Sequence, residues 1–189
     1  MNARRLGLFG GTFDPPHLGH VAALRDAWGS GRFDEIMVTV AGDPYLKSAD
    51  GALTPAPQRL AMAKAAFGEL PGVAVSDMEI ARGGPTYTID TVRELLETGA
   101  EIELIIGADV VSQLPRWRSA DELATIVALY VLPRGDEMVT IPSGWRGQVA
   151  HMEPVDLSST ETRAKLEKGE NPAGLVPESV IPLLTRAPH

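Results

Sequence analysis

Short, continuously apolar runs alternate along this chain with segments whose apolar residues recur at helical spacing. Five runs are predicted to be strands: Leu6–Phe9, Glu35–Ala41, Val73–Ser76, Glu103–Ile106 and Leu129–Leu132. Apolar runs of this kind are typical of parallel strands that are covered on both faces. Strands that alternate with helices are joined by crossover connections. The pattern therefore predicts an α/β fold: a Rossmann-like, doubly wound, mainly parallel sheet with helices on both faces.

Three segments between the runs are predicted to be helices: Leu18–Trp28, the alanine-rich Gln58–Phe67, and the stretch YTIDTVRELLETG, which Gly99 closes. The loops richest in glycine and proline, Gly42–Pro57 and Pro133–Gly147, are interpreted as surface or active-site loops and not as domain linkers. A length of 189 residues with 44% hydrophobic residues fits one continuous core. We therefore expect a single domain over residues 1–189.

The charge and the missing residue types exclude several function classes. A net charge of -8, from 17 basic and 25 acidic residues, argues against binding to nucleic acid or to a membrane surface, since both need a basic field. The absence of cysteine excludes disulfides, thiolate metal sites and a cysteine nucleophile, and it fits a reducing cytoplasm. No apolar run approaches the roughly 20 residues of a membrane span. We expect a cytoplasmic protein; the sequence leaves open whether it forms a homo-oligomer.

The stretch LGLFGGTFDPPHLGH gathers chemically active residues at the end of the first predicted strand. Ligands of open parallel sheets bind outside the carboxyl ends of the strands. Gly10 and Gly11 permit the close backbone approach and unusual dihedrals of a phosphate-binding turn. His17 and His20 are three residues apart, so both can project from the first turn of the following helix, whose N-terminus suits an anion.

Other interpretations of this stretch stay open. The two histidines with Asp14 could form a metal site, although only His151 and His189 remain as further imidazole ligands. The glycines could simply end a strand, and the histidines could be ordinary core or surface groups. The two common phosphate loops, Gly-x-Gly-x-x-Gly and Gly-x-x-x-x-Gly-Lys-Ser/Thr, are both absent after the first strand.

A second constellation, LSSTETRAKLEKGE, lies near the other end of the chain. Ser158 followed by Glu161 forms a capping box, and Gly169 is a helix stop, so the segment could be no more than a well-capped helix. It also offers backbone amides, three hydroxyls and Arg163, which together suit a triphosphate. The two interpretations are compatible.

These two segments carry a resemblance to a known family. GGTFDPPHLGH resembles the signature of the His-x-x-His nucleotidyltransferase superfamily, and the second segment resembles the Ser-Ser-Thr-x-x-Arg motif of bacterial nicotinate-nucleotide adenylyltransferases. Three further segments are similar to that family in the same order: GGPTYTIDTVREL, LIIGADVVSQLPRW and LVPESV. The resemblance therefore spans nearly the whole chain.

The chain departs from the family pattern at three places. The loop after the second strand reads AGDPYLKS, which keeps Pro44 and Lys47 but lacks the family's histidine. Arg118 follows Trp117 where many members carry an aromatic or polar residue, and the chain ends LLTRAPH without the usual aromatic ending. These differences concern the second substrate more than ATP.

The resemblance implies adenylyl transfer from ATP to nicotinate mononucleotide, with release of pyrophosphate, in NAD biosynthesis. It implies His17, His20 and Arg163 as catalytic residues. The ATP-binding residues would be Gly10, Gly11, Thr12, Phe13, His17, His20, Asp109, Ser158, Ser159, Thr160 and Arg163. The mononucleotide-binding residues would be Asp14, Lys47, Thr88, Trp117 and Arg118.

Some of these roles have ordinary alternatives. Trp117 would stack on the pyridine ring, but it could be core packing; Asp109 would accept from a ribose hydroxyl, but it could be a loop cap. Mg²⁺ would enter with ATP and be held mainly by the triphosphate and water, with no protein metal site. Rival activities are transfer to nicotinamide mononucleotide or phosphopantetheine, a cytidylyltransferase, and a nucleotide sensor without turnover.

Overall fold

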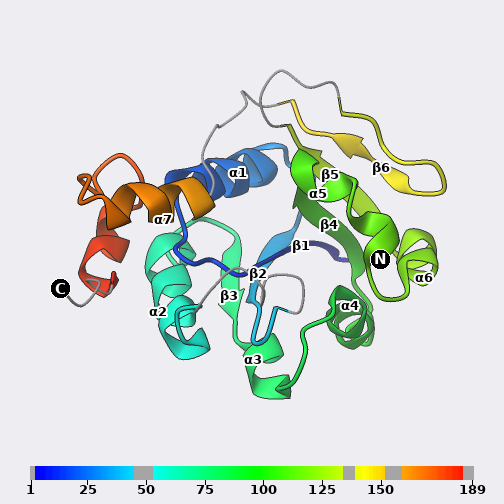
Figure 1. The fold of residues 1–189 in the computed structure, drawn as a ribbon. Coiled ribbons are helices and arrows are strands. Elements are labelled where there is room, and N and C mark those ends of the chain that lie inside the picture. Colours follow the sequence, from blue (N-terminus) through cyan, green and yellow to red (C-terminus); the bar gives the residue numbers. More distant parts are fainter. Residues whose placement is uncertain (1–2, 45–52, 134–138, 152–158, 185–189) are drawn as a thin grey trace.

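Six strands lie side by side in the order β3-β2-β1-β4-β5-β6, and each neighbouring pair is parallel (Figure 1). The computed structural model describes residues 3–44, 53–133, 139–151 and 159–184. The strands are β1 (Arg5–Gly11), β2 (Glu35–Val40), β3 (Val73–Ser76), β4 (Glu101–Gly107), β5 (Ala128–Leu132) and β6 (Arg146–Val149). This order places a topological switch point between β1 and β4. The predicted α/β fold is confirmed.

Two strands differ from the sequence-based expectation. β3 lies at one edge of the sheet and is half-buried, so its short apolar run does not mark a strand covered on both faces. β6, at the other edge, begins inside the stretch that was predicted to be a loop. Its sequence RGQV has no apolar run, because an edge strand on the solvent side needs little burial.

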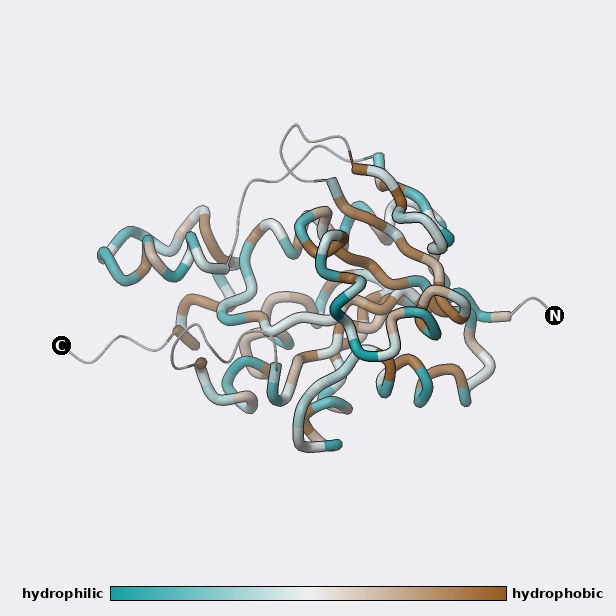
Figure 2. The backbone as a smooth tube through the Cα atoms, turned by 45° about the vertical axis from the view of Figure 1, so that its right-hand side comes forward, coloured by the Kyte–Doolittle hydropathy of each residue, from teal (hydrophilic) through white to brown (hydrophobic). Residues whose placement is uncertain are grey.

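Helices cover both faces of the sheet. The long helices are α1 (Leu18–Gly29), α2 (Ala56–Phe67), α4 (Thr88–Leu96) and α7 (Ser159–Glu167), and the shorter ones are α3 (Met78–Arg82), α5 (Ala108–Val111), η1 (Leu114–Arg116), α6 (Ala120–Ile126) and η2 (Glu178–Leu183). Leu24 of α1 and Phe67 of α2 are in the core on one face, and Val92 of α4 and Leu123 of α6 are in the core on the other. Figure 2 shows the apolar residues concentrated in the central strands.

The segment before and within η2 joins the two helices on the first face. Its Val176 and Val180 pack with Met62 of α2 in a small core. The backbone carbonyl of Leu175 accepts a hydrogen bond from the amide of Leu18, the first residue of α1, at 3.0 Å. The C-terminal part of the chain therefore fixes the start of the helix that follows the histidine motif.

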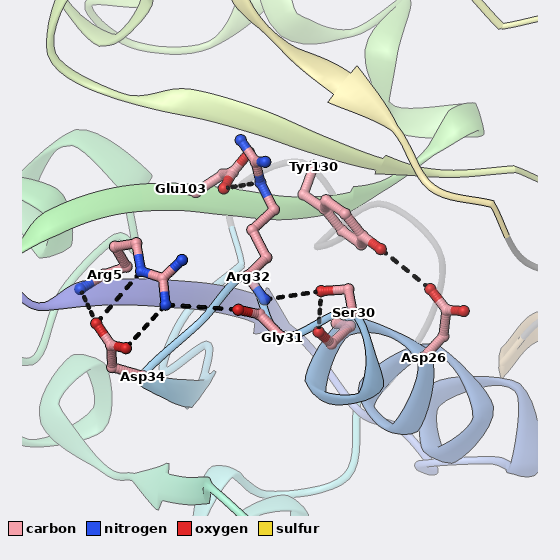
Figure 3. Close-up of polar contacts among 9 residues, drawn as sticks. Arg5, Asp26, Ser30, Gly31, Arg32, Asp34, Glu103 and Tyr130 are labelled. Atoms are coloured by element: carbon pink, nitrogen blue, oxygen red, sulfur yellow. Dashed lines mark hydrogen bonds and ion pairs between the residues drawn. The ribbon is translucent and has the colours of Figure 1, made fainter.

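A group of polar contacts lies where the chain returns from α1 to the sheet (Figure 3). The pairs are Arg5 with Asp34 (2.9 Å), Arg32 with Glu103 (2.6 Å) and Tyr130 with Asp26 (3.1 Å). Arg5 is the first residue of β1 and Asp34 directly precedes β2, so this ion pair lies at the amino ends of the two strands, away from their carboxyl ends. Among the residues described, no helix has both the length and the apolar character that crossing a membrane requires.

Candidate active site

The loop after β1 turns sharply at Phe13, whose φ is 51°. The Phe13 ring is buried and lies over Gly11, where an added Cβ would come 2.7 Å from the ring carbon Cζ. A side chain at position 11 would therefore displace the ring. The unusual dihedral is at Phe13 and at neither glycine, which corrects the expectation for Gly10 and Gly11. A left-handed phenylalanine costs energy and is typical of functional sites.

Gly10 has a different role from Gly11. It is exposed, and an added Cβ would meet only the Thr39 hydroxyl, at an ordinary 3.4 Å. The carboxyl end of β1 therefore presents bare backbone on an open side. Close approach of a ligand to the backbone at Gly10 stays a prediction.

The imidazoles of His17 and His20 stack, with ring centroids 3.6 Å apart and an interplanar angle of 25°. The His17 backbone amide donates a hydrogen bond to Nδ1 of His20 at 3.1 Å. Since Nδ1 accepts, the proton of a neutral His20 ring lies on Nε2. The Phe13 ring meets the His20 ring edge-on at 5.1 Å and fixes its plane. His20 is thereby prepared as an Nε2–H donor.

The first amides of α1 are already used within the protein. The His17 amide bonds to His20, and the Leu18 amide bonds to the Leu175 carbonyl. These two amides are therefore engaged within the protein. The binding of an anion at the N-terminus of this helix stays a prediction.

The N-terminal part of α7 lies against the histidine loop, although 149 residues separate the two contacting positions. Arg163 donates from Nη1 to the Asp14 carbonyl at 2.6 Å and from Nη2 to the Thr160 hydroxyl at 3.3 Å. The Ser159 hydroxyl donates to the Pro15 carbonyl at 3.4 Å. The two motifs therefore meet in space. Ser158 lies outside the described residues, so its capping role stays a prediction, whereas Gly169 has a φ of 76° just beyond the helix end, as expected.

Arg59 is buried directly behind the loop, with an exposed fraction of 1%. Its guanidinium donates to three backbone carbonyls: Nη1 to Thr12 at 2.9 Å, Nε to Thr54 at 2.8 Å and Nη2 to Gly42 at 3.1 Å. Burial lowers the pKa of Arg59, and the nearby charge of Asp14 opposes this shift. All three bonded segments belong to the loops at the carboxyl edge.

Asp14 faces the same region. Its side chain is 5% exposed, and Oδ2 accepts a hydrogen bond from the Thr54 amide at 3.0 Å. This carboxylate is thus engaged in holding the chain that leads into α2. Its contact with a mononucleotide stays a prediction, as does that of Lys47, which lies outside the described residues.

Two further candidate residues, Thr88 and Arg118, lie near the start of α4. The Thr86 hydroxyl accepts hydrogen bonds from the amides of Gly42 and Asp43, at 3.1 and 3.2 Å. The next residue, Tyr87, precedes Thr88 at the start of α4, and the Arg118 guanidinium lies over the Tyr87 ring with Cζ 4.5 Å from its centroid. The structure therefore places the Arg118 guanidinium beside Tyr87, the residue that precedes Thr88, and the role of Thr88 and Arg118 in binding stays a prediction.

The positions of Trp117 and Asp109 leave open both of the interpretations given above. Trp117 packs on the core beside α4 but keeps part of its surface exposed. Asp109 is exposed in the first turn of α5, just past the carboxyl end of β4 and next to β1. Neither position conflicts with a ligand contact.

A buried carboxyl group lies between β2 and α4. Glu79 is 5% exposed and accepts a hydrogen bond from the Thr91 hydroxyl at 2.7 Å, and Arg82 donates to the same hydroxyl at 3.1 Å. Burial raises the pKa of Glu79, and the hydrogen bond from Thr91 limits the rise. The network fixes α3 against α4, one turn after Thr88.

Sequence reasoning missed Arg59 and Glu79. Arg59 shares one helix face with the buried Met62, Ala63 and Phe67, and a charged residue at such a position was a usable signal. Glu79 lies in a short helix with no such pattern. Within the described ranges, no three His, Cys, Asp or Glu side chains are grouped so that they could hold a metal ion.

Comparisons with known proteins agree on one family. Residues 8–165 match the model of the family described as cytidylyltransferase-like. A protein of Gemmatimonas aurantiaca is 39% identical over 93% of this chain and 87% of its own length. Another, of Methylibium petroleiphilum, is 40% identical over 98% and 92%. Both are named probable nicotinate-nucleotide adenylyltransferase.

Solved structures share the fold at lower identity. The nicotinic acid mononucleotide adenylyltransferase of Plasmodium falciparum, complexed with NaAD, is 18% identical with a TM-score of 0.80, covering 95% of this chain and 94% of that one. At this identity the likeness concerns the arrangement of strands and helices.

Proposed function

The chain belongs to the nicotinate-nucleotide adenylyltransferases of the cytidylyltransferase-like family, and we propose that it transfers the adenylyl group of ATP to nicotinate mononucleotide. The observation that carries the proposal is the bond from Arg163 to the Asp14 carbonyl, which joins the two motifs at the carboxyl end of β1. One site thereby combines imidazole donors, hydroxyls and a guanidinium, and these groups suit a triphosphate.

The reaction needs no protein base. A phosphate monoester has a second pKa of about 6, so the mononucleotide phosphate is mostly a dianion near neutral pH. One of its oxygens bonds to the α-phosphorus of ATP, while the bond from that phosphorus to the oxygen bridging to the β-phosphate breaks, and pyrophosphate leaves. Catalysis then depends on positioning two anions and stabilising the charge that develops.

The ATP side of the site supplies the charge-stabilising groups. His20 donates from Nε2 to an α-phosphate oxygen, with His17 stacked on it as the second imidazole. Arg163 lies at the edge of the same loop, where its charge offsets that of the leaving pyrophosphate. The bare backbone at Gly10 lets the nucleotide lie close to the strand end.

The mononucleotide side begins at Thr88 and Arg118. The pyridine ring stacks on the exposed part of Trp117, and its carboxylate meets the start of α4 and the guanidinium held over Tyr87. Lys47 supplies a further positive charge for the mononucleotide phosphate.

We infer that magnesium enters this site together with ATP. The ion would be held mainly by phosphate oxygens and water. When bound, it neutralises charge on the triphosphate.

An assay of pyrophosphate release tests the proposal. The chain is incubated with ATP and Mg²⁺ and, in separate arms, nicotinate mononucleotide, nicotinamide mononucleotide or phosphopantetheine. We expect turnover to be fastest with nicotinate mononucleotide. Faster turnover with another acceptor would contradict the proposed substrate, and the absence of release in every arm would contradict the activity.

A further inference from the structure

We propose that Arg59 is a positioning residue that fixes the separation of the ATP side and the mononucleotide side of the site. This inference rests on the proposed function. Its starting observation is that one buried guanidinium donates to carbonyls of three separate segments: Thr12 in the histidine loop, Gly42 after β2, and Thr54 before α2.

The first of these bonds reaches the ATP side. Thr12 belongs to the loop whose shape is set by Phe13 and whose far end carries His17 and His20. Because the bond is made to the backbone carbonyl, it constrains the path of the loop whatever the Thr12 side chain does. The length of this bond, 2.9 Å, is that of an ordinary hydrogen bond.

The other two bonds reach the mononucleotide side. The Gly42 carbonyl accepts from Arg59, and the Gly42 amide donates to the Thr86 hydroxyl, one residue before Tyr87 and two before Thr88. Thr54, at the other end of the segment that contains Lys47, is held from two sides: its carbonyl by Arg59 and its amide by Asp14. A single side chain thus connects both substrate regions.

The surroundings explain why arginine occupies this position. Three acceptors at different directions need a planar group with several N–H donors, and an ammonium group on a lysine stem cannot reach all three. The bond to Thr12 is buried, so loss of that donor would leave the Thr12 carbonyl unsatisfied. In-line transfer is sensitive to such shifts, because a displacement of about 1 Å can reduce a rate about 10²-fold.

The variant Arg59→Lys tests the proposal in the full-length chain. We expect kcat for adenylyl transfer to fall at least about 10-fold, while the Kd of ATP alone, measured by calorimetry without acceptor, changes less than about threefold. A lower kcat with a nearly unchanged Kd of ATP would indicate that the two substrates are misplaced relative to each other. Loss of folded protein would instead reduce the number of ATP sites together with the rate.

A matched control separates positioning from stability. Met62 is buried on the same helix but contacts the C-terminal segment, away from the loops. Met62→Leu or Met62→Ala, whichever has the Tm closer to that of Arg59→Lys, should keep kcat within about twofold of wild type at 25 °C. An equal loss of kcat in this control would overturn the proposal, and so would a wild-type kcat in Arg59→Lys.

Chemical rescue gives a second, independent variant. We expect methylguanidinium to restore part of the kcat of Arg59→Ala, and methylammonium at the same concentration to restore none. Equal effects of the two cations on kcat would contradict the positioning role. Failure of both Arg59 variants to fold would also contradict it, because Arg59 would then be needed only for folding. A wild type without turnover would instead contradict the proposed function.

Discussion

The backbone amide of His17 donates to Nδ1 of His20 at 3.1 Å, and this bond decides which nitrogen of His20 can act on a substrate. Because Nδ1 is an acceptor, the donor of the neutral ring is Nε2. The two histidines of the motif therefore have different tasks: the backbone of one sets the tautomer of the other. This explains why the spacing of three residues matters beyond simple proximity.

Two substitutions of His20 separate its two nitrogens. His20→Asn keeps an acceptor near the Nδ1 position but has no donor at Nε2, so we expect kcat to fall at least about 10²-fold, as after loss of one charge-stabilising donor. His20→Gln places an amide donor near the Nε2 position and should lose less. The measurement is steady-state kcat at saturating ATP and mononucleotide, with far-UV circular dichroism as the control for folding. Equal activity of His20→Asn and wild type would remove Nε2 from the mechanism.

The metal requirement is a separate prediction. We expect EDTA to abolish turnover and excess Mg²⁺ to restore it, while the purified protein contains no stoichiometric zinc, because the described residues group no protein metal ligands. Elemental analysis of the chain and of a His17→Ala/His20→Ala double variant provides the measurement. One zinc ion per wild-type chain that disappears in the double variant would support the alternative that these histidines bind a metal.

Glu79 predicts a pH dependence of stability. Burial raises the pKa of Glu79 in the folded chain above its ordinary value of 4.5, so the folded state binds this proton more tightly than the unfolded state does. The contribution of this group to the free energy of unfolding therefore decreases as the pH rises from about 4.5 through the raised pKa. The glutamine of Glu79→Gln cannot ionise, so this decrease in the free energy of unfolding is absent from the variant.

Urea unfolding between pH 4.5 and 8 measures the effect. We expect the free energy of unfolding of Glu79→Gln, relative to wild type, to increase with pH. The control is Glu97→Gln, which removes a carboxyl group at an exposed position just after α4 and so measures the effect of this substitution away from the buried network. A constant difference for Glu79→Gln would show that its carboxyl does not titrate differently in the two states.

The parts of the fold that the sequence predicts are those in which local pattern and burial agree. The strand containing Leu6 is a continuous apolar run because both of its faces are covered, and the structure confirms it. The strand at Arg146 has no such pattern because it lies at an edge. The two predicted motifs meet in space, but the left-handed Phe13 and the three bonds of Arg59 depend on segments far apart in the chain. Spacing along a sequence carries no information about such contacts.

We expect Arg118 to distinguish a nicotinate carboxylate from a nicotinamide amide. Arg118 is exposed, and its guanidinium lies over the ring of Tyr87. Because Tyr87 directly precedes Thr88, the first residue of α4, the positive charge of Arg118 lies near the start of this helix. A charged hydrogen bond to a carboxylate contributes about 1.5–3 kcal/mol, which corresponds to a preference of roughly 10- to 150-fold. Arg118→Ala should therefore raise KM for nicotinate mononucleotide, leave KM for ATP unchanged and narrow the preference for nicotinate over nicotinamide mononucleotide by at least about 10-fold.

The matched control is Arg116→Ala, which removes an exposed arginine two residues earlier. It should change neither of the KM values nor the preference between the two mononucleotides. Tyr87→Leu removes the ring that holds the guanidinium and should narrow the preference less than Arg118→Ala does. The measurement is kcat/KM for both mononucleotides on the four proteins. A ratio that Arg118→Ala leaves unchanged would contradict the side-chain contact, and a wild type that prefers the amide would contradict the nicotinate assignment itself.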